Sequence, residues 1–268
     1  MDLTTRYLGL TLKNPLIASA SPLTSDLGNL RRASEAVAVP VIASLNGISR
    51  SGWCDYARLV EQAGANAIEL NAYFVPSDLS LTGVEVEDLY LDVVRSVKSA
   101  VSIPVSVKLS PYFSAPGRMA VALAEAGADG LVLFNRFYQP DIDLAALRLK
   151  RDIELSRPAE IRLPLLWIGV LAGNIHASVA ASSGVDSVEE VVKYLLVGAD
   201  VVMTTTAILR HGIEHMATLV GGLHDWLAAR DIDGVAAIRG RISRGAVNDP
   251  TAFDRANYIQ VLQSYTAG

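Results

Sequence analysis

The chain has 268 residues, of which 51% are hydrophobic, 19% are charged and 6% are aromatic. This composition excludes a disordered chain, and the length suits one large α/β domain. The net charge of −5 provides no basic stripe for nucleic acid or an anionic membrane surface. The single cysteine, Cys54, cannot form an internal disulfide and favours a cytoplasmic location. The sequence predicts neither a signal peptide nor a membrane helix, which argues against secreted and membrane classes.

Short apolar runs alternate with amphipathic stretches along the chain. Residues 4–8 and 10–13 predict a hairpin around Gly9. Seven apolar runs then predict buried parallel strands at residues 16–20, 41–45, 67–70, 105–109, 131–134, 178–181 and 201–203. Helices are expected at residues 55–63, 86–100, 119–126, 165–171 and 187–196, with a strand as the alternative for 165–171. This alternation predicts right-handed crossovers and a parallel sheet.

Repeated helix-to-strand junctions favour a barrel over an open dinucleotide-binding sheet. Ala-Gly-Ala or Val-Gly-Ala occurs around Gly64, Gly127 and Gly198, where a left-handed glycine ends a helix just before a strand. A second junction, Ala-Val-x-(Val/Ile)-Pro-Val, occurs at residues 36–41 and 100–105. The sequence contains no Gly-x-Gly-x-x-Gly motif. We therefore predict a TIM-type (β/α)8 barrel, built as a single domain from residues 1–268.

One βα unit of that barrel is not found in the sequence. A complete barrel needs eight strands, whereas seven are predicted. The chain passes from a helix start at Leu30 to a helix end at Ala36, so the second unit is either deleted or not recorded in the printed sequence. We favour an unrecorded segment, because a deletion inside a closed barrel would be costly. Without the unit, the neighbouring strands either pair directly in a narrower ring or leave exposed edges.

The carboxyl ends of the strands carry the candidate chemistry, because barrel enzymes place their sites there. The polar residues at these ends are Ser19, Ser21, Asn46, Glu69, Asn71, Lys108, Ser110, Asn135, Ser183, Thr205 and Thr206. Amides, hydroxyls and one lysine suit an anionic, carbonyl-rich ligand better than a metal ion or a pair of catalytic carboxylates. The last two ends, at Ser183-Gly184 and Thr205-Thr206, occupy the usual phosphate position of a barrel. No metal site is predicted.

These motifs resemble, in the same order, those of the dihydroorotate dehydrogenases, which are flavin-dependent barrel enzymes. The run Val107-Lys108-Leu109-Ser110-Pro111-Tyr112-Phe113 closely resembles their fifth-strand motif. Further resemblances are Asn14-Pro15 with Ser19-Ala20-Ser21, Glu69-Leu70-Asn71, Asn135, and Thr205-Thr206-Ala207. The similarity extends from about Leu3 to His215.

The resemblance implies an FMN-dependent oxidoreductase that acts on a CH–CH group, as in the oxidation of dihydroorotate to orotate in pyrimidine biosynthesis. It implies that Lys108 lies beside the N1/C2 side of the flavin and stabilises its anionic reduced form. The residues that it places at the cofactor are Ser19, Ala20, Ser21, Asn71, Lys108, Ser183, Gly184, Thr205 and Thr206. Asn71 and Asn135 would also bind the substrate through their amides. The implied partners are a small-molecule substrate and a second copy in a homodimer.

Two departures from the family pattern leave an alternative open. The family's cysteine or serine base falls three residues after Asn71, at Phe74, whose side chain cannot accept a proton. The neighbouring Tyr73 is the fallback, although a phenol is a weak base at neutral pH. The family's second-strand lysine and a substrate-binding asparagine belong to the unit that is not found. The alternative is therefore a flavin-binding or degenerate barrel with little or no dihydroorotate activity. For Lys108, an ion pair inside the barrel is the structural alternative.

Overall fold

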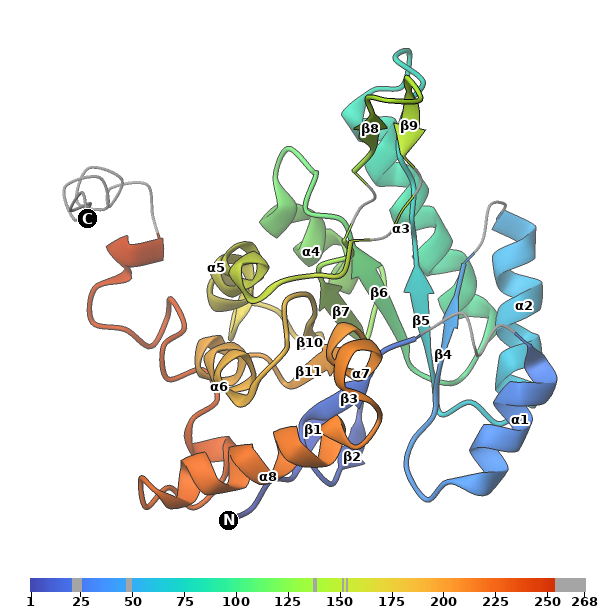
Figure 1. Ribbon diagram of the computed structural model, residues 1–268. Helices are drawn as coiled ribbons and strands as arrows, with labels where there is room; N and C mark the ends of the chain where they lie inside the picture. The colour runs from blue at the N-terminus through green and yellow to red at the C-terminus, as the bar shows by residue number, and fades with distance from the viewer. Residues whose placement is uncertain (21–25, 47–49, 137–138, 151, 153, 254–268) are drawn as a thin grey trace, which may run out of the picture.

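The computed structural model describes residues 1–20, 26–46, 50–136, 139–150, 152 and 154–253. Within them, seven parallel strands form one curled sheet with helices packed on its outer face (Figure 1). The strands are β3 (Leu16–Ala18), β4 (Ile42–Leu45), β5 (Ala67–Asn71), β6 (Val105–Leu109), β7 (Gly130–Leu133), β10 (Ser178–Ala181) and β11 (Val201–Thr204). Their order across the sheet is β3-β11-β10-β7-β6-β5-β4. This arrangement confirms the predicted TIM-type α/β architecture with seven of its eight strands.

The sheet is open between β3 and β4. In the described part of the chain, β3 pairs only with β11, and β4 pairs only with β5. Of the two outcomes expected for a missing βα unit, the structure therefore has the exposed edges rather than a closed seven-stranded ring. Direct pairing would require a changed shear and a narrower interior, which already contains packed side chains.

The outer helices follow the strands in chain order. They are α1 (Leu27–Ala36), α2 (Arg50–Gln62), α3 (Gly83–Ala100), α4 (Pro116–Glu125), α5 (Arg162–Leu171), α6 (Val188–Val197), α7 (Thr206–His211) and α8 (His215–Ala228). Capping boxes begin two of them, with Thr82 and Glu85 at α3 and with Ser187 and Glu190 at α6. The junction glycines are left-handed as predicted, for example Gly198 with φ 117° at the end of α6. None of the described helices is long and apolar enough to span a membrane.

The inner face of the sheet is closed at its amino-terminal end by the predicted hairpin. Its strands are β1 (Thr5–Tyr7) and β2 (Leu10–Leu12), which pair antiparallel. The turn residues Leu8 and Gly9 both have positive φ, 54° and 75°, as a two-residue type I′ turn requires. Tyr7 is fully buried against inward-facing residues of the strands such as Val132 and Val201. The hairpin therefore fills the lower interior and leaves the carboxyl ends of the strands free for a site.

Three expectations from the sequence need correction. The strand predicted at 16–20 ends at Ala18, so Ser19 and Ala20 already belong to the loop. The strand alternative for 165–171 is wrong, because α5 covers this segment. The predicted strands omit β8 (Asp141–Asp143), which pairs antiparallel with β9 (Arg148–Lys150). Pairing between β8 and β9, rather than a local apolar alternation, defines this short hairpin. It projects at the top of Figure 1.

Candidate active site

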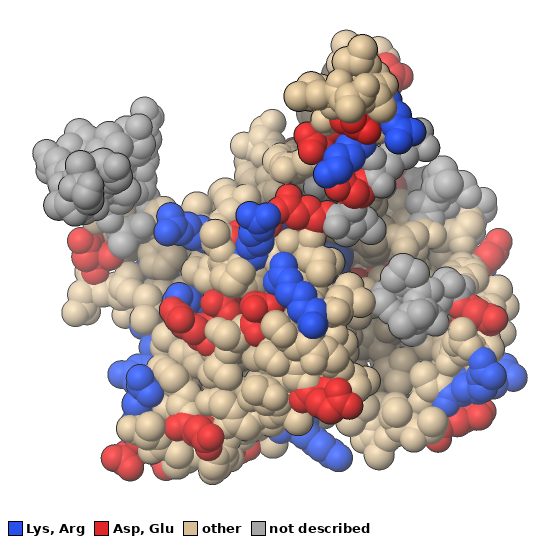
Figure 2. All heavy atoms as spheres, viewed as in Figure 1, with Lys and Arg blue, Asp and Glu red and all other residues tan. Residues whose placement is uncertain are grey.

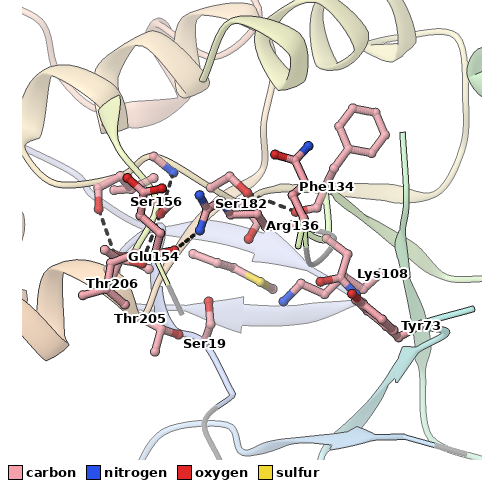
Figure 3. Close-up of a pocket in the computed structure, with 18 of the residues that line it drawn as sticks. Ser19, Tyr73, Lys108, Phe134, Arg136, Glu154, Ser156, Ser182, Thr205 and Thr206 are labelled. Carbon is pink, nitrogen blue, oxygen red and sulfur yellow. Dashed lines mark hydrogen bonds between the residues drawn. The ribbon is translucent and has the colours of Figure 1, made fainter. Parts of the chain in front are cut away.

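A cavity of about 920 Å³ opens at the carboxyl ends of the strands, a volume typical of small-molecule sites. Residues of β6 and β11, of the loops after β3, β5, β7, β10 and β11, and of the segment around residues 139–156 line it. Figure 3 shows Lys108 and Tyr73 on one side of this cavity and Ser156, Thr205 and Thr206 on the other. The parallel sheet thus brings together groups that lie far apart in the sequence, because the carboxyl ends of its strands share one edge.

Most of the predicted site residues line this cavity. They are Ser19, Tyr73, Lys108, Asn135, Ser183, Gly184, Thr205 and Thr206. Ala20, Asn71 and Phe74 are not among the lining residues, and Ser21 lies outside the described part of the chain. Phe74 was expected at the position of the base, yet its neighbour Tyr73 is the one that faces the cavity. Local counting along the chain cannot decide which of two adjacent loop side chains turns inward.

Three asparagines connect the ends of three strands. Asn135, after β7, donates a hydrogen bond from Nδ2 to Oδ1 of Asn71 at 2.5 Å. Asn71, at the end of β5, donates in turn to Oδ1 of Asn46 at 2.6 Å. Asn71 is therefore one hydrogen bond away from the cavity and holds the amide of Asn135, which lines it. Fixed amides of this kind can bind the carbonyl and N–H groups of a heterocycle.

Lys108 extends from β6 into the cavity and has a charged neighbour behind it (Figure 3). Its Nζ lies 3.7 Å from Oε1 of Glu69, and both side chains are largely buried. The same Oε1 accepts a hydrogen bond from the hydroxyl of Ser44 at 3.0 Å. The lysine thus takes part in an ion pair inside the barrel and also faces the cavity. The two interpretations from the sequence, a cation beside the ligand and a structural ion pair, therefore do not exclude each other.

Hydroxyl groups and a close-packed glycine form the opposite end of the cavity. Ser183 and Gly184 both have left-handed backbone, with φ 84° and 70°. A Cβ at Gly184 would lie 2.8 Å from the carbonyl oxygen of Arg157 and equally close to Cγ2 of Ile161, so only glycine fits. The N–H of Gly184 donates to Oγ of Ser156 at 3.3 Å, and this Oγ lies 3.1 Å from Oγ1 of Thr206.

Ser156 is a site residue that the sequence analysis missed, because it belongs to no strand end and no motif marks it. Arg210 fixes its backbone, since Nη2 of Arg210 donates to the carbonyl oxygen of Ser156 at 2.8 Å. Nη1 of the same arginine donates to Oδ1 of Asp186 at 3.0 Å. Burial raises the pKa of Asp186, but hydrogen bonds from Arg210 and His211 outweigh it and hold the pKa below its usual value. This ion pair ties the loop before α5 to the loop after β10.

The mouth of the cavity is lined by charged residues on and around the β8–β9 hairpin. Each cation there has an acidic neighbour: Nε of Arg136 lies 2.9 Å from Glu160, and Nζ of Lys150 lies 2.6 Å from Asp152. Acidic and basic side chains are interspersed in the same way over the face shown in Figure 2. Among the described residues, no group of three or more His, Cys, Asp or Glu side chains is arranged to hold a metal ion.

The donor groups of the cavity fit a flavin mononucleotide. Hydroxyls and the tightly packed Gly184 at one end match a phosphate, for which small residues and backbone N–H groups are suited. Lys108 and the Asn71–Asn135 amide pair at the other end match a ring system with carbonyl groups that becomes anionic when reduced. The fold and this site define a TIM-type barrel with a polar ligand cavity at the carboxyl ends of its strands.

Comparisons with known proteins identify the family. A family model described as "Dihydroorotate dehydrogenase" matches residues 20–227. A relative from Aeropyrum pernix, named as a dihydroorotate dehydrogenase A (fumarate), is 31% identical over 225 residues, which cover 81% of this chain and 70% of the relative. The NAD-dependent dihydropyrimidine dehydrogenase subunit PreA of Escherichia coli is 26% identical over 91% of this chain and 62% of its own length. The catalytic subunit of dihydroorotate dehydrogenase B (NAD(+)) of Methanothermobacter thermautotrophicus is 29% identical over 74% of this chain and 67% of its own.

The chain belongs to the dihydroorotate dehydrogenase family, a family of flavin-dependent oxidoreductases. The E. coli relative is longer, since the match leaves more than a third of it uncovered.

Proposed function

We propose that the protein is an FMN-dependent oxidoreductase that oxidises the CH–CH bond of a dihydropyrimidine, with dihydroorotate as the first candidate substrate and pyrimidine biosynthesis as its role. The observation that carries this proposal is the two-ended cavity. One end presents Lys108 and hydrogen-bonded amides, and the other presents hydroxyls around Gly184. Such a cavity in a member of this family supports a flavin with its ring at one end and its phosphate at the other.

Within this proposal the chain's own residues divide into two groups. Ser183, Gly184, Thr205 and Thr206 would hold the phosphate, and Ser19 would approach the ring from the loop after β3. The family resemblance assigns Ala20 and Ser21 to the same cofactor. Lys108 would supply a positive charge beside the ring, because it reaches the cavity from the carboxyl end of β6. FMN supplies the hydride acceptor when it is bound. Asn135 would orient the pyrimidine directly, and Asn71 would contribute by holding the amide of Asn135 in place.

Removal of a proton from the substrate is the weak point of this assignment. Phe74 carries no group that can accept a proton, and Tyr73 faces the cavity next to it in sequence. A positioned base typically contributes about 10²–10⁴-fold to such a step. These facts favour a second candidate, a flavoprotein of this fold with little dihydroorotate turnover. The same cavity serves both candidates, and they differ only in rate.

The visible absorption spectrum of the purified protein is the first test. We expect flavin bands and release of FMN on denaturation, whereas a protein that stays colourless after incubation with FMN would contradict both candidates. Oxidation of dihydroorotate, and separately of 5,6-dihydrouracil, with a dye as electron acceptor then distinguishes them. Turnover of either substrate supports the first candidate. Bound flavin that both substrates reduce only slowly, or not at all, supports the second.

The remaining parts of the proposal concern the cellular location and the oligomeric state of the protein. A single cysteine suits a reducing cytoplasm. A homodimer is proposed from the family resemblance, and the mass of the purified protein in solution tests it.

A further inference from the structure

Glu69 is a buried carboxylate for which the proposed function provides no role. Its side chain is 6% exposed and is not part of the cavity wall. A charge in such a place is costly unless polar partners compensate it. Glu69 has two, and both meet the same oxygen: the hydroxyl of Ser44 at 3.0 Å and the ammonium of Lys108 at 3.7 Å.

The register of the sheet explains this arrangement. Glu69 pairs with Ser106 across β5 and β6, and Asn71 pairs with Lys108. Side chains on one face of a strand repeat every two residues, so Glu69 lies diagonally across from Lys108 on the inner face. Glu69 is also one layer farther from the carboxyl ends. The carboxylate therefore meets Lys108 from the barrel interior, while the lysine itself lines the cavity.

The hairpin below keeps a neutral phenol near the Glu69 carboxylate. Tyr7 of β1 is fully buried on the inner face. Burial raises the pKa of Tyr7, and the charge of the Glu69 carboxylate raises it further. Glu69 thus interacts with Tyr7 on one side and with Lys108 on the other, and its surroundings are fixed by the packed sheet and hairpin.

We propose that Glu69 is a positioning residue for Lys108. Glu69 sets how much positive charge the lysine presents to the bound flavin, and thereby sets the flavin's midpoint potential. This inference rests on the proposed function. A carboxylate 3.7 Å from the ammonium offsets part of its field, because the site is shielded from water. Removing the carboxylate charge should therefore favour the anionic reduced flavin, and removing the lysine charge should disfavour it.

The test measures the midpoint potential of FMN bound to the full-length protein, by equilibration with dyes of known potential. We expect Glu69→Gln to increase the ratio of the affinities for reduced and oxidised flavin about tenfold over wild type. This change corresponds to a midpoint potential that is about 30 mV more positive. Lys108→Met should shift it in the opposite direction. Glu69→Asp keeps the charge but withdraws it by one methylene, and should give a smaller positive shift.

Glu190→Gln is the matched control. Glu190 is also a buried glutamate, but it accepts hydrogen bonds from Ser187 at the start of α6 and does not contact Lys108. This variant should lose thermal stability and keep the wild-type potential.

A Glu69→Gln protein that loses stability but keeps the wild-type potential would show a purely structural role and overturn the inference. If Glu69→Gln does not fold, an unchanged potential in Glu69→Asp overturns it equally. A wild-type protein that binds no FMN is recognised beforehand from its absorption spectrum. That outcome refutes the proposed function, and this inference with it.

Discussion

The two ends of the curled sheet are built differently. At one end, the edge strand β3 pairs with β11, and Ser156 and Arg210 tie the loops around β11 together. At the other end, β4 has a partner on one side only within the described chain, and Asn46 after it is exposed. Both ends thus border the opening, but the side chains proposed for the phosphate are braced by several segments, whereas those proposed for the reaction connect through Asn46 to the open edge.

The intact mass of the purified protein decides the origin of the open edge. A mass equal to the 28.6 kDa of the printed sequence corresponds to a true deletion. A larger mass corresponds to a segment that the printed sequence does not record, which is the alternative favoured from the sequence.

The largest effect is expected at the open end, from installing the base. The family count predicts that Phe74→Cys and Phe74→Ser raise the rate of dihydroorotate oxidation by about 10²-fold or more, because they supply a group that can take the substrate proton. The position of Tyr73 in the cavity wall predicts no gain from either variant. Dye-linked turnover, corrected for bound FMN, is the measurement. Tyr73→Phe is the companion variant: if it abolishes turnover while neither Phe74 variant helps, Tyr73 is the base and the sequence count is wrong.

Lys108→Ala should lower flavin-dependent turnover by about 100-fold and weaken FMN retention, because it removes a cation from the ring end of the cavity. Gel filtration followed by the ratio of flavin to protein absorbance gives the retention. Lys193→Ala is the control, since Lys193 pairs only with Glu189 on the exposed side of α6. Full flavin occupancy and unchanged turnover in Lys108→Ala would show that Lys108 serves only in a structural ion pair.

Arg210→Ala tests the braced end and should lower FMN affinity about tenfold, because the backbone of Ser156 loses a charged hydrogen-bond donor. Titration of the FMN-free protein with FMN, followed by flavin fluorescence, gives the affinity. Arg230→Ala, which removes an arginine stacked on Trp226 of α8, should leave the affinity unchanged. Equal losses in the two variants would mean that the effect is a general loss of stability.

The smallest effect concerns acid stability at the braced end. Hydrogen bonds hold the pKa of Asp186 below its usual value of 3.8, so its ionised form stabilises the fold above that value. This contribution is lost as the pH falls through the lowered pKa. Asp186→Asn should therefore melt about 2–4 °C below wild type at pH 7, and the difference should shrink below about pH 4. Asp55→Asn, at an exposed ion pair of α2, is the control and should show no such convergence. A constant difference across the pH range would contradict the assignment.

The sequence by itself determined the repeating βα pattern, the glycines at Gly64, Gly127 and Gly198, and the polar residues at the strand ends. These features follow from local signals: apolar runs, left-handed glycines and the position of a residue after a strand. Only the tertiary structure decided that Tyr73 rather than Phe74 faces the cavity, that Ser156 joins two strand ends, and that β8 and β9 form a hairpin at the mouth.

The contact between Glu69 and Lys108 shows the physical reason. Both residues stand out in the sequence, but their contact depends on the register of β5 against β6, which places them diagonally on the inner face. Register and the inward or outward turn of a loop side chain are set by packing between segments far apart in the chain, and a local sequence pattern contains no information on that packing.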